Sequence, residues 1–530
     1  MDAESERLGG KRMETSSWMS AATYSPLDPK KLENFSNPLR LPGNEGVMGV
    51  LDASDAPVRV VARRKEVEVL PGRRTEMWVY KAERAGRSYT NPTYRVRRGS
   101  RFSAAFLNNP DADTTIHWHG LGVPWEMDGH PTRHVYPGGA YRYEFSVDDA
   151  ASTYWYHPHA HGSTALQTYR GLAGLFLVED EGDDRLREAL DLRFGETEIP
   201  LVIQDRTFDE DGGLVYEPDE MTRFMGVTGD TILVNLTPTP SLDVGRRTYR
   251  FRLLNASNSR TYRLAFAGGG DLLPFWLAGT DGGLLEEPRA VEELFLSPGE
   301  RADVLLDLGG LADGDVVALK SLHFDPMHNE HEMEEGMDHH MGPARLGDGD
   351  EFYVLRLNVS GAGRAASGSM PGALSEPEPM NVDGAPTRIV ALSTDAGAGE
   401  MSWLINGLTY NIEEYPVVVE RGSTEVWEYR NDEKSMPHPM HIHGFDQRVL
   451  ERKGSPEQVR RLAVDQRRRR VATDLGRKDT VAVWPGETVR VAVDFSHDHD
   501  GEQTYLFHCH VLEHEDQGMM LNFKVVHGEI

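Results

Sequence analysis

The chain has a single cysteine among its 530 residues, so it can form no internal disulfide bond. It also lacks long apolar runs, since stretches such as residues 172–178 are far shorter than the roughly 20 residues that span a bilayer as a helix. Lysine and arginine are fewer than aspartate and glutamate, 56 against 85, and the formal net charge at pH 7 is −29. These absences exclude a disulfide-stapled scaffold and a helical membrane protein, and they argue against nucleic acid or an anionic membrane surface as a partner.

The first thirty residues contain neither an apolar core of signal-peptide length nor a twin-arginine pair. We therefore expect a protein that stays in the cytoplasm, reaches a spore coat or the exterior by another route, or has lost its leader. For the oligomeric state, a monomer is favoured.

Strand signals separated by Gly, Pro, Asn and Asp turns dominate the chain, and long amphipathic helices are scarce. The first and last parts of the chain contain similar sequences. Residues 95–109 resemble residues 417–431, and TIHWHG near the start resembles PMHIHG near the end. Such a repeat predicts duplicated units, here small β-barrels or sandwiches of cupredoxin type. The predicted fold is therefore all-β, with three cupredoxin-like Greek-key β-barrel domains.

Composition shifts set the expected boundaries, because acidic and Gly/Ala/Ser/Pro-rich stretches read as connections. We predict an N-terminal extension (1–31), a first domain (32–180), a structural middle domain (181–360), a linker (361–386) and a last domain (387–530).

The lone cysteine, Cys509, is flanked by His508 and His510, with His514 five residues on and Met519 ten residues on. A thiolate, imidazoles and a weak thioether are the ligand set of a blue copper site. In an extended strand, Cys509 points to one face while its two neighbours point to the other. The thiolate could therefore hold one copper while the flanking imidazoles reach a second metal centre.

Three more His-x-His pairs support a metal cluster, because each pair in a strand places two imidazoles on one face. The pairs are His117 with His119, His157 with His159, and His441 with His443, and His438 lies three residues ahead of the last pair.

Other histidines are read differently. His497 and His499 form a pair in the polar sequence FSHDHDG, which is typical of a loop. His161 is interpreted as structural, or as supporting the ligands rather than binding metal.

With these motifs in view, the chain resembles three-domain multicopper oxidases, in the branch of the bacterial spore-coat laccases, bilirubin oxidases and cuprous oxidases. The matching motifs, in the family's order, are IHWHG, WYHPHAHG, HPMHIHG and FHCHVLEHEDQGMM. The likeness extends to YRFRLLNASNSR, LAGTDGGLLEEP and LSPGERADVLLD and covers nearly the whole chain from about Leu32.

The resemblance implies four copper ions. The type 1 ion would take His438, Cys509 and His514, with Met519 as a weak axial ligand. The type 2 ion would take His117 and His441, and the type 3 pair would take His119, His157, His159, His443, His508 and His510. Met520 adjoins Met519, but the ten-residue spacing from the cysteine favours Met519. A methionine at this position indicates a moderate reduction potential.

Two carboxylates occupy the positions where this family places its proton-relay acids, Asp128 in VPWEMDGHP and Glu515 directly after His514. Reduction of dioxygen to water consumes protons, so groups that relay them are needed. The alternative is that Asp128 shapes an Asp-Gly turn and that Glu515 is a surface acid.

The resemblance implies an oxidoreductase of laccase type that takes single electrons at the type 1 copper, near His514 at the surface, and reduces O2 to water at the other three coppers. Phenols and aromatic amines are the expected donors, with bilirubin and cuprous ion as further candidates. A rival reading is a metallo-oxidase for cuprous or manganous ion, motivated by the Met/His-rich segment 323–342. That segment is otherwise an acidic surface loop.

The full set of four His-x-His pairs argues against two other kinds of copper protein. A copper nitrite reductase would need no type 3 pair, and a copper-storage or electron-carrying protein would need no oxygen-reducing cluster. The basic insertion 451–479 either steers acidic substrates or is a solvated excursion of the surface.

Overall fold

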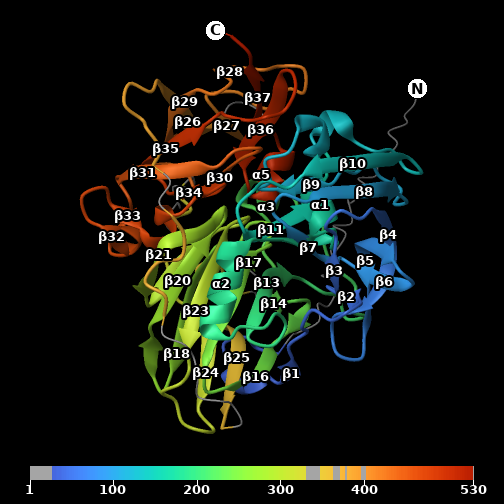
Figure 1. Ribbon diagram of the computed structural model, residues 1–530, viewed down its shortest axis with the longest axis vertical. Coiled ribbons are helices and arrows are strands. Elements are labelled where there is room, and N and C mark those ends of the chain that lie inside the picture. The colour runs from blue at the N-terminus through green and yellow to red at the C-terminus, as the bar shows by residue number, and fades with distance from the viewer. Residues whose placement is uncertain (1–26, 330–345, 362–369, 377–378, 396–400, 529–530) are drawn as a thin grey trace, which may run out of the picture.

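The structure is a computed structural model that describes residues 27–329, 346–361, 370–376, 379–395 and 401–528. Three units follow one another along the chain, each built from two sheets that enclose apolar side chains (Figure 1). The predicted all-β class is confirmed. No helix in the described ranges is both long enough and apolar enough to cross a membrane.

The first unit pairs a six-stranded sheet with a five-stranded one. The six-stranded sheet has the order β10 (Ala140–Ser146), β8 (Arg101–Asn108), β4 (Val58–Glu68), β5 (Arg74–Arg84), β6 (Arg87–Thr90), β2 (Gly46–Val47). The second sheet has the order β3 (Val50–Asp52), β7 (Thr93–Arg97), β12 (Gly174–Glu179), β11 (Ser152–His157), β9 (His117–His119), and α1 (Thr164–Tyr169) precedes β12. Buried and exposed side chains alternate along β8, which is how a strand with one face in the core is recognised.

The middle unit has two seven-stranded sheets. One has the order β1 (Asn37–Pro38), β16 (Pro240–Gly245), β25 (Phe352–Ser360), β24 (Val316–Ser321), β18 (Tyr262–Gly268), β19 (Asp271–Leu273), with β22 (Glu293–Leu296) beside β18. The other has the order β15 (Thr237–Pro238), β14 (Thr231–Val234), β13 (Glu198–Arg206), β17 (Thr248–Asn255), β23 (Arg301–Asp307), β20 (Phe275–Thr280), β21 (Gly283–Val291). Strands β13 and β17 are buried along their length on both faces.

The last unit has two five-stranded sheets and a small hairpin. Their orders are β27 (Ser402–Ile405), β26 (Thr387–Asp395), β29 (Thr424–Asn431), β35 (Thr488–Asp494), β31 (Gln447–Lys453), and β28 (Val417–Glu420), β37 (Met520–Val526), β36 (Gln503–Cys509), β30 (His438–Ile442), β34 (Thr480–Val483). The hairpin joins β32 (Ala463–Asp465) to β33 (Arg470–Val471), and the short helices α4 (Glu457–Arg460) and α5 (Leu512–Asp516) complete the unit.

Strand β25 ends at Ser360 and β26 begins at Thr387, so the described residues of the predicted linker lie between these two strands. The start of the first unit differs. Residues 37–38 form β1, which pairs in parallel with β16 of the middle unit. Of the described residues, the segment before the first unit therefore pairs with the middle unit.

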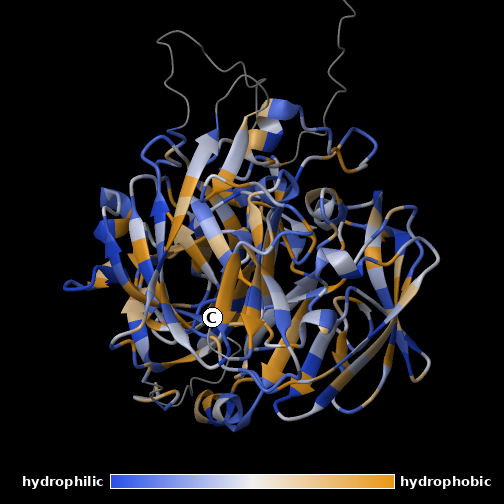
Figure 2. Cartoon of the chain, turned by 90° about the horizontal axis from the view of Figure 1, so that it is seen from above, coloured by the Kyte–Doolittle hydropathy of each residue, from blue (hydrophilic) through white to orange (hydrophobic). Residues whose placement is uncertain are grey.

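The units meet through polar as well as apolar contacts. Figure 2 shows apolar residues gathered on strands in the interior and polar residues in the peripheral loops. The connecting helix α2 (Glu181–Leu190) brings Asp183 to 3.0 Å from Arg252 and to 2.6 Å from Arg250, both buried in the middle unit. Arg252 also donates to Thr153 of the first unit. This ion cluster ties the helix to two units.

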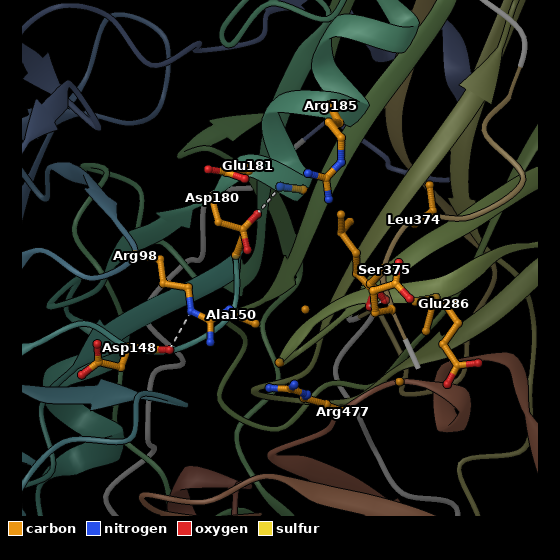
Figure 3. A pocket seen from close by; sticks show the side chains of 18 of the residues that line it. Arg98, Asp148, Ala150, Asp180, Glu181, Arg185, Glu286, Leu374, Ser375 and Arg477 are labelled. Carbon is orange, nitrogen blue, oxygen red and sulfur yellow. Dashed lines mark hydrogen bonds between the residues drawn. The ribbon is translucent and has the colours of Figure 1, made fainter. Parts of the chain in front are cut away.

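A polar cavity of about 630 Å³ is lined by residues of all three units and of the linker. Figure 3 shows the guanidinium groups of Arg98 and Arg185 turned toward it, with Arg477 below them in the view. Arg477 is two residues from Asp479, which contacts the site described next.

Candidate metal centre

The four His-x-His pairs lie on neighbouring strands of the first and last units. In the first unit β9 pairs with β11, so that His117 is directly opposite His157. In the last unit β30 pairs with β36, so that His441 is directly opposite His508. The two pairs of strands face each other where the first and last units meet, beside α5 (Figure 1).

His117 and His441, the predicted type 2 ligands, approach each other across this junction. Their Nε2 atoms are 3.4 Å apart. Each ring donates its Nδ1–H to a backbone carbonyl, of Asp128 at 2.8 Å and of Asp479 at 3.0 Å. Because a carbonyl can only accept, the Nε2 lone pairs of both rings are left to face one another.

The six predicted type 3 ligands separate into two groups of three. In the first group His119 Nδ1 lies 3.4 Å from His157 Nε2 and 3.3 Å from His510 Nε2. In the second group the Nε2 atoms of His159 and His443 lie 3.3 and 3.1 Å from His508 Nε2.

These rings fit copper by their chemistry. All eight are buried, and burial lowers the pKa of seven of them, which favours the neutral imidazole that binds metal: His119, His157, His159, His441, His443, His508 and His510. His157 and His508 also donate Nδ1–H to backbone carbonyls, which leaves their Nε2 lone pairs free. Several lone pairs pointing into one buried space need a cation, and imidazole suits copper.

The predicted type 1 ligands meet on the other face of β36. Cys509 Sγ lies 3.4 Å from His438 Nδ1 and 3.5 Å from His514 Nδ1, and all three residues are buried. The outer nitrogens are also bonded, His438 Nε2 to Ser435 Oγ at 3.1 Å and His514 Nε2 to the carbonyl of Phe224 at 2.9 Å. Burial raises the pKa of the Cys509 thiol, so a bound cation would be needed to stabilise the thiolate.

Met519 is held beside these ligands by its backbone. It donates its N–H to the carbonyl of His514 at 2.8 Å and accepts the N–H of Cys509 at 3.1 Å. Met520, the first residue of β37, pairs with His508 on the neighbouring strand β36. Both thioethers are buried.

The expected relay acids both contact the cluster. Asp128 Oδ2 lies 2.6 Å from His443 Nδ1, and its Oδ1 lies 3.3 Å from His117 Nδ1. Glu515 lies between His159 and His508, with oxygens 3.5 and 3.4 Å from their Nδ1 atoms. Burial raises the pKa of both carboxyl groups. The alternative of a surface acid at Glu515 is wrong, because its side chain is 1% exposed.

A third carboxylate at the cluster, Asp479, was not predicted from the sequence. Its Oδ1 lies 3.0 Å from His119 Nε2 and 3.5 Å from His441 Nδ1. Arg301 of the middle unit binds both of its oxygens, at 2.7 and 2.5 Å. Burial opposes the charge on Asp479, but Arg301 and His119 hold its pKa well below the ordinary value.

Two expectations need correction here. The middle domain, predicted to be structural, reaches both candidate centres, through Arg301 and through Phe224 in the helix α3 (Glu220–Met225). His514, implied to lie near the surface, has no exposed area, because α3 covers it.

The remaining histidines join none of these groups in the described part of the chain. The rings of His497 and His499 stack at 5.4 Å after β35, and His161 packs edge-on against Tyr410. In the Met/His-rich segment, His328 Nε2 lies 3.2 Å from Asp348 Oδ2, and Asn329 donates its N–H to the carbonyl of Ser435, beside the type 1 ligands. Residues 330–342 of that segment lie outside the described residues.

The insertion 451–479 is partly packed rather than wholly solvated. Arg452 is buried and binds both oxygens of Asp474, at 2.7 and 2.9 Å. Arg461, half exposed, lies 3.1 Å from Glu293 of the middle unit. The segment thus joins the last unit to the middle one.

Comparisons with known proteins agree with this geometry. Family models described as "Multicopper oxidase" match residues 62–183 and 382–529. The laccase of Haloferax volcanii is 30% identical over 98% of this chain and 88% of its own length. The crystal structure of the McoA multicopper oxidase of Aquifex aeolicus superimposes with a TM-score of 0.80, at 40% identity, over 93% of this chain and all of that one. A metallo-oxidase from Campylobacter jejuni gives a TM-score of 0.71 at 25% identity, over 95% and 99% of the two chains. With two sheets in each of three units of cupredoxin type, and copper ligands offered where the first and last units meet, the chain belongs to the multicopper oxidase family.

Proposed function

We propose that this multicopper oxidase couples one-electron oxidation of phenolic or aromatic amine donors to the reduction of O2 to water. The observation that carries the proposal is the arrangement on β36. Cys509 lies among the type 1 ligands, and the residues on either side of it, His508 and His510, lie one in each group of three imidazoles.

This arrangement gives electrons a short covalent path. From the thiol, the path along the backbone reaches either imidazole group within one residue. Four bound copper ions would supply the redox chemistry, one at the type 1 ligands, one between His117 and His441, and one with each group of three imidazoles. The protein fixes the ligands and excludes bulk water, since every one of these side chains is buried.

Protons are the second requirement. Water formation from one O2 takes up four electrons and four protons, so the cluster needs acids that deliver protons into a buried space. Asp128 and Glu515 touch four of the eight imidazoles from two sides, and their raised pKa values favour the protonated form that can donate. They are the proposed donors.

A metallo-oxidase is the second candidate, and two observations favour it. His514 is buried beneath α3, which would hinder a bulky donor, and Asn329 of the Met/His-rich segment donates its N–H to the carbonyl of Ser435, three residues from His438. A structural relative from Campylobacter jejuni is itself described as a metallo-oxidase. Thioethers and imidazoles are suited to cuprous ion.

Oxygen uptake by the copper-loaded protein separates the two candidates. Uptake is measured with 2,6-dimethoxyphenol and with cuprous ion under identical conditions. Faster turnover on the phenol supports the laccase-type function. Faster turnover on cuprous ion makes the protein a metallo-oxidase, and copper binding without oxygen uptake on either donor contradicts both.

A further inference from the structure

One backbone carbonyl joins the candidate type 1 centre to a tryptophan outside the ligand set. The carbonyl oxygen of Phe224, in α3 of the middle unit, accepts the Nε2–H of His514 at 2.9 Å. The same oxygen accepts the Nε1–H of Trp403, on β27 of the last unit, at 2.8 Å. The two donors therefore share one acceptor across the boundary between two units.

The indole of Trp403 also packs against both type 1 imidazoles. Its ring centroid lies 4.6 Å from that of His438, edge to face, and 5.1 Å from that of His514. It also stacks on Phe224, at a centroid distance of 4.6 Å and an interplanar angle of 6°. Trp403 is fully buried and Phe224 nearly so.

These contacts have two consequences for His514. Because a carbonyl only accepts, the bond to Phe224 places the proton on Nε2 and leaves the Nδ1 lone pair toward Cys509. The stacked rings also close the space around the outer edge of the imidazole. A donor molecule meets α3 instead, whose exposed side chains are Glu220, Met221 and Arg223.

We propose that Trp403 is a positioning residue of the type 1 centre. Together with the carbonyl of Phe224 it fixes the orientation of His514, and it screens both imidazoles from organic donors, so that electrons enter across α3. This proposal rests on the proposed function, because it assumes that copper at these ligands accepts electrons from outside. Trp403 would thereby influence which electron donors the protein oxidises.

Two variants of Trp403 test the two roles, and a second tryptophan, Trp427, provides the control. Trp403→Phe keeps an aromatic ring but removes the N–H, whereas Trp403→Ala removes both. Trp427→Phe is the matched control, because Trp427 is equally buried in the same unit and donates its N–H to Glu425 at 2.9 Å. The ring contacts of Trp427 are with Tyr429 and with Phe495, Phe507 and Phe523, not with histidine.

Three quantities are measured on copper-loaded proteins: the blue absorption band, the type 1 reduction potential, and the rate at which a chelator bleaches the band. For Trp403→Phe we expect a shifted band and potential and bleaching about fivefold faster, the ratio that corresponds to the loss of one buried hydrogen bond. Trp427→Phe should leave all three as in the parent protein. These readouts need no turnover, so they decide the positioning role even if the protein oxidises no phenol.

The screening role is tested by steady-state kinetics. Trp403→Ala should lower KM for 2,6-dimethoxyphenol relative to ferrocyanide, a small ion that needs no contact with the imidazole edge. If Trp403→Phe and Trp427→Phe give the same band, potential and bleaching rate, Trp403 is ordinary packing and the positioning role is wrong. If Trp403→Ala folds and the ratio of the two KM values is unchanged, the screening role is wrong. Should Trp403→Ala fail to fold, Trp403→Leu, which also removes the aromatic rings but keeps more apolar volume, decides the screening role in the same way.

Discussion

At the scale of single residues, the proposed copper ligands lie in short sequence motifs, whereas some of the side chains that contact them come from distant parts of the chain. A His-x-His pair or the His-Cys-His triplet needs only the alternation of a strand to divide its side chains between two faces, so spacing predicted these residues. Asp128 and Glu515 were found because they lie beside recognisable motifs. The structure adds the reason for their raised pKa values, which is the complete burial of both carboxyl groups.

Replacing either acid by its amide should slow the reduction of oxygen without disturbing the blue centre. Glu515→Gln keeps the size of the side chain but removes the proton it can donate, and loss of general acid catalysis costs about a hundredfold or more. The measurement is the return of the blue band when an anaerobically reduced sample is mixed with O2. Glu502→Gln, an exposed acid just before β36, is the control.

Reduction of the blue centre by the donor should be unaffected in Glu515→Gln and Asp128→Asn, because among the described residues no hydrogen bond or ion pair joins either carboxyl group to Cys509 or its two histidines. Return of the band at the parent rate in both variants would contradict the relay role.

Asp479 and Arg301 could not be predicted in the same way. They are 178 residues apart, and nothing in the spacing of either one indicates that they meet at His119. Asp479 had been assigned to a basic insertion, and Arg301 to a domain expected to be structural. Their roles depend on how the three units are arranged, which sequence patterns do not specify.

At the scale of elements, α2 shows how a connection can become part of the structure. It was expected only as an acidic boundary, yet its Asp183 lies in a buried ion cluster with Arg250, Arg252 and Glu198. Burial opposes ionisation of Glu198, but Arg252 and Arg250 hold its pKa far below the ordinary value. Because every member is buried, removing one partner leaves an unpaired charge in the interior.

This cluster should make stability fall in acid. A carboxyl group whose pKa is lowered by folding stabilises the protein above its unfolded pKa of about 4.3, and that stabilisation is lost as the pH falls through the lower folded value. Glu198→Gln should lower the free energy of unfolding at pH 7 by about 3–5 kcal/mol and weaken its dependence on pH below about 5.

Urea unfolding of the parent protein and of Glu198→Gln at pH 7, 5 and 4 measures this effect. Asp111→Asn removes an exposed partner of Arg64 and should change little, which makes it the control. Equal losses in the two variants at pH 7 would contradict the assignment of the stability to the buried cluster.

At the scale of the whole molecule, both candidate copper centres receive side chains or backbone groups from more than one of the three units. The eight imidazoles come equally from the first and last units, and the middle unit supplies Arg301 to one centre and α3 to the other. The repeat in the sequence predicted that the first and last units share the imidazoles. The contacts of the middle unit depend on how the units pack, which is why the sequence did not predict the burial of His514.

The central claim is that one strand, β36, links two copper centres through Cys509. The most direct test is Cys509→Ser, with metal content and visible and paramagnetic spectra measured on the copper-loaded protein. We expect the blue absorption to disappear while three of the four copper ions stay at the imidazoles of the cluster, because serine is a poor ligand for a type 1 site and the cluster does not use residue 509. A blue band that survives the change would contradict it.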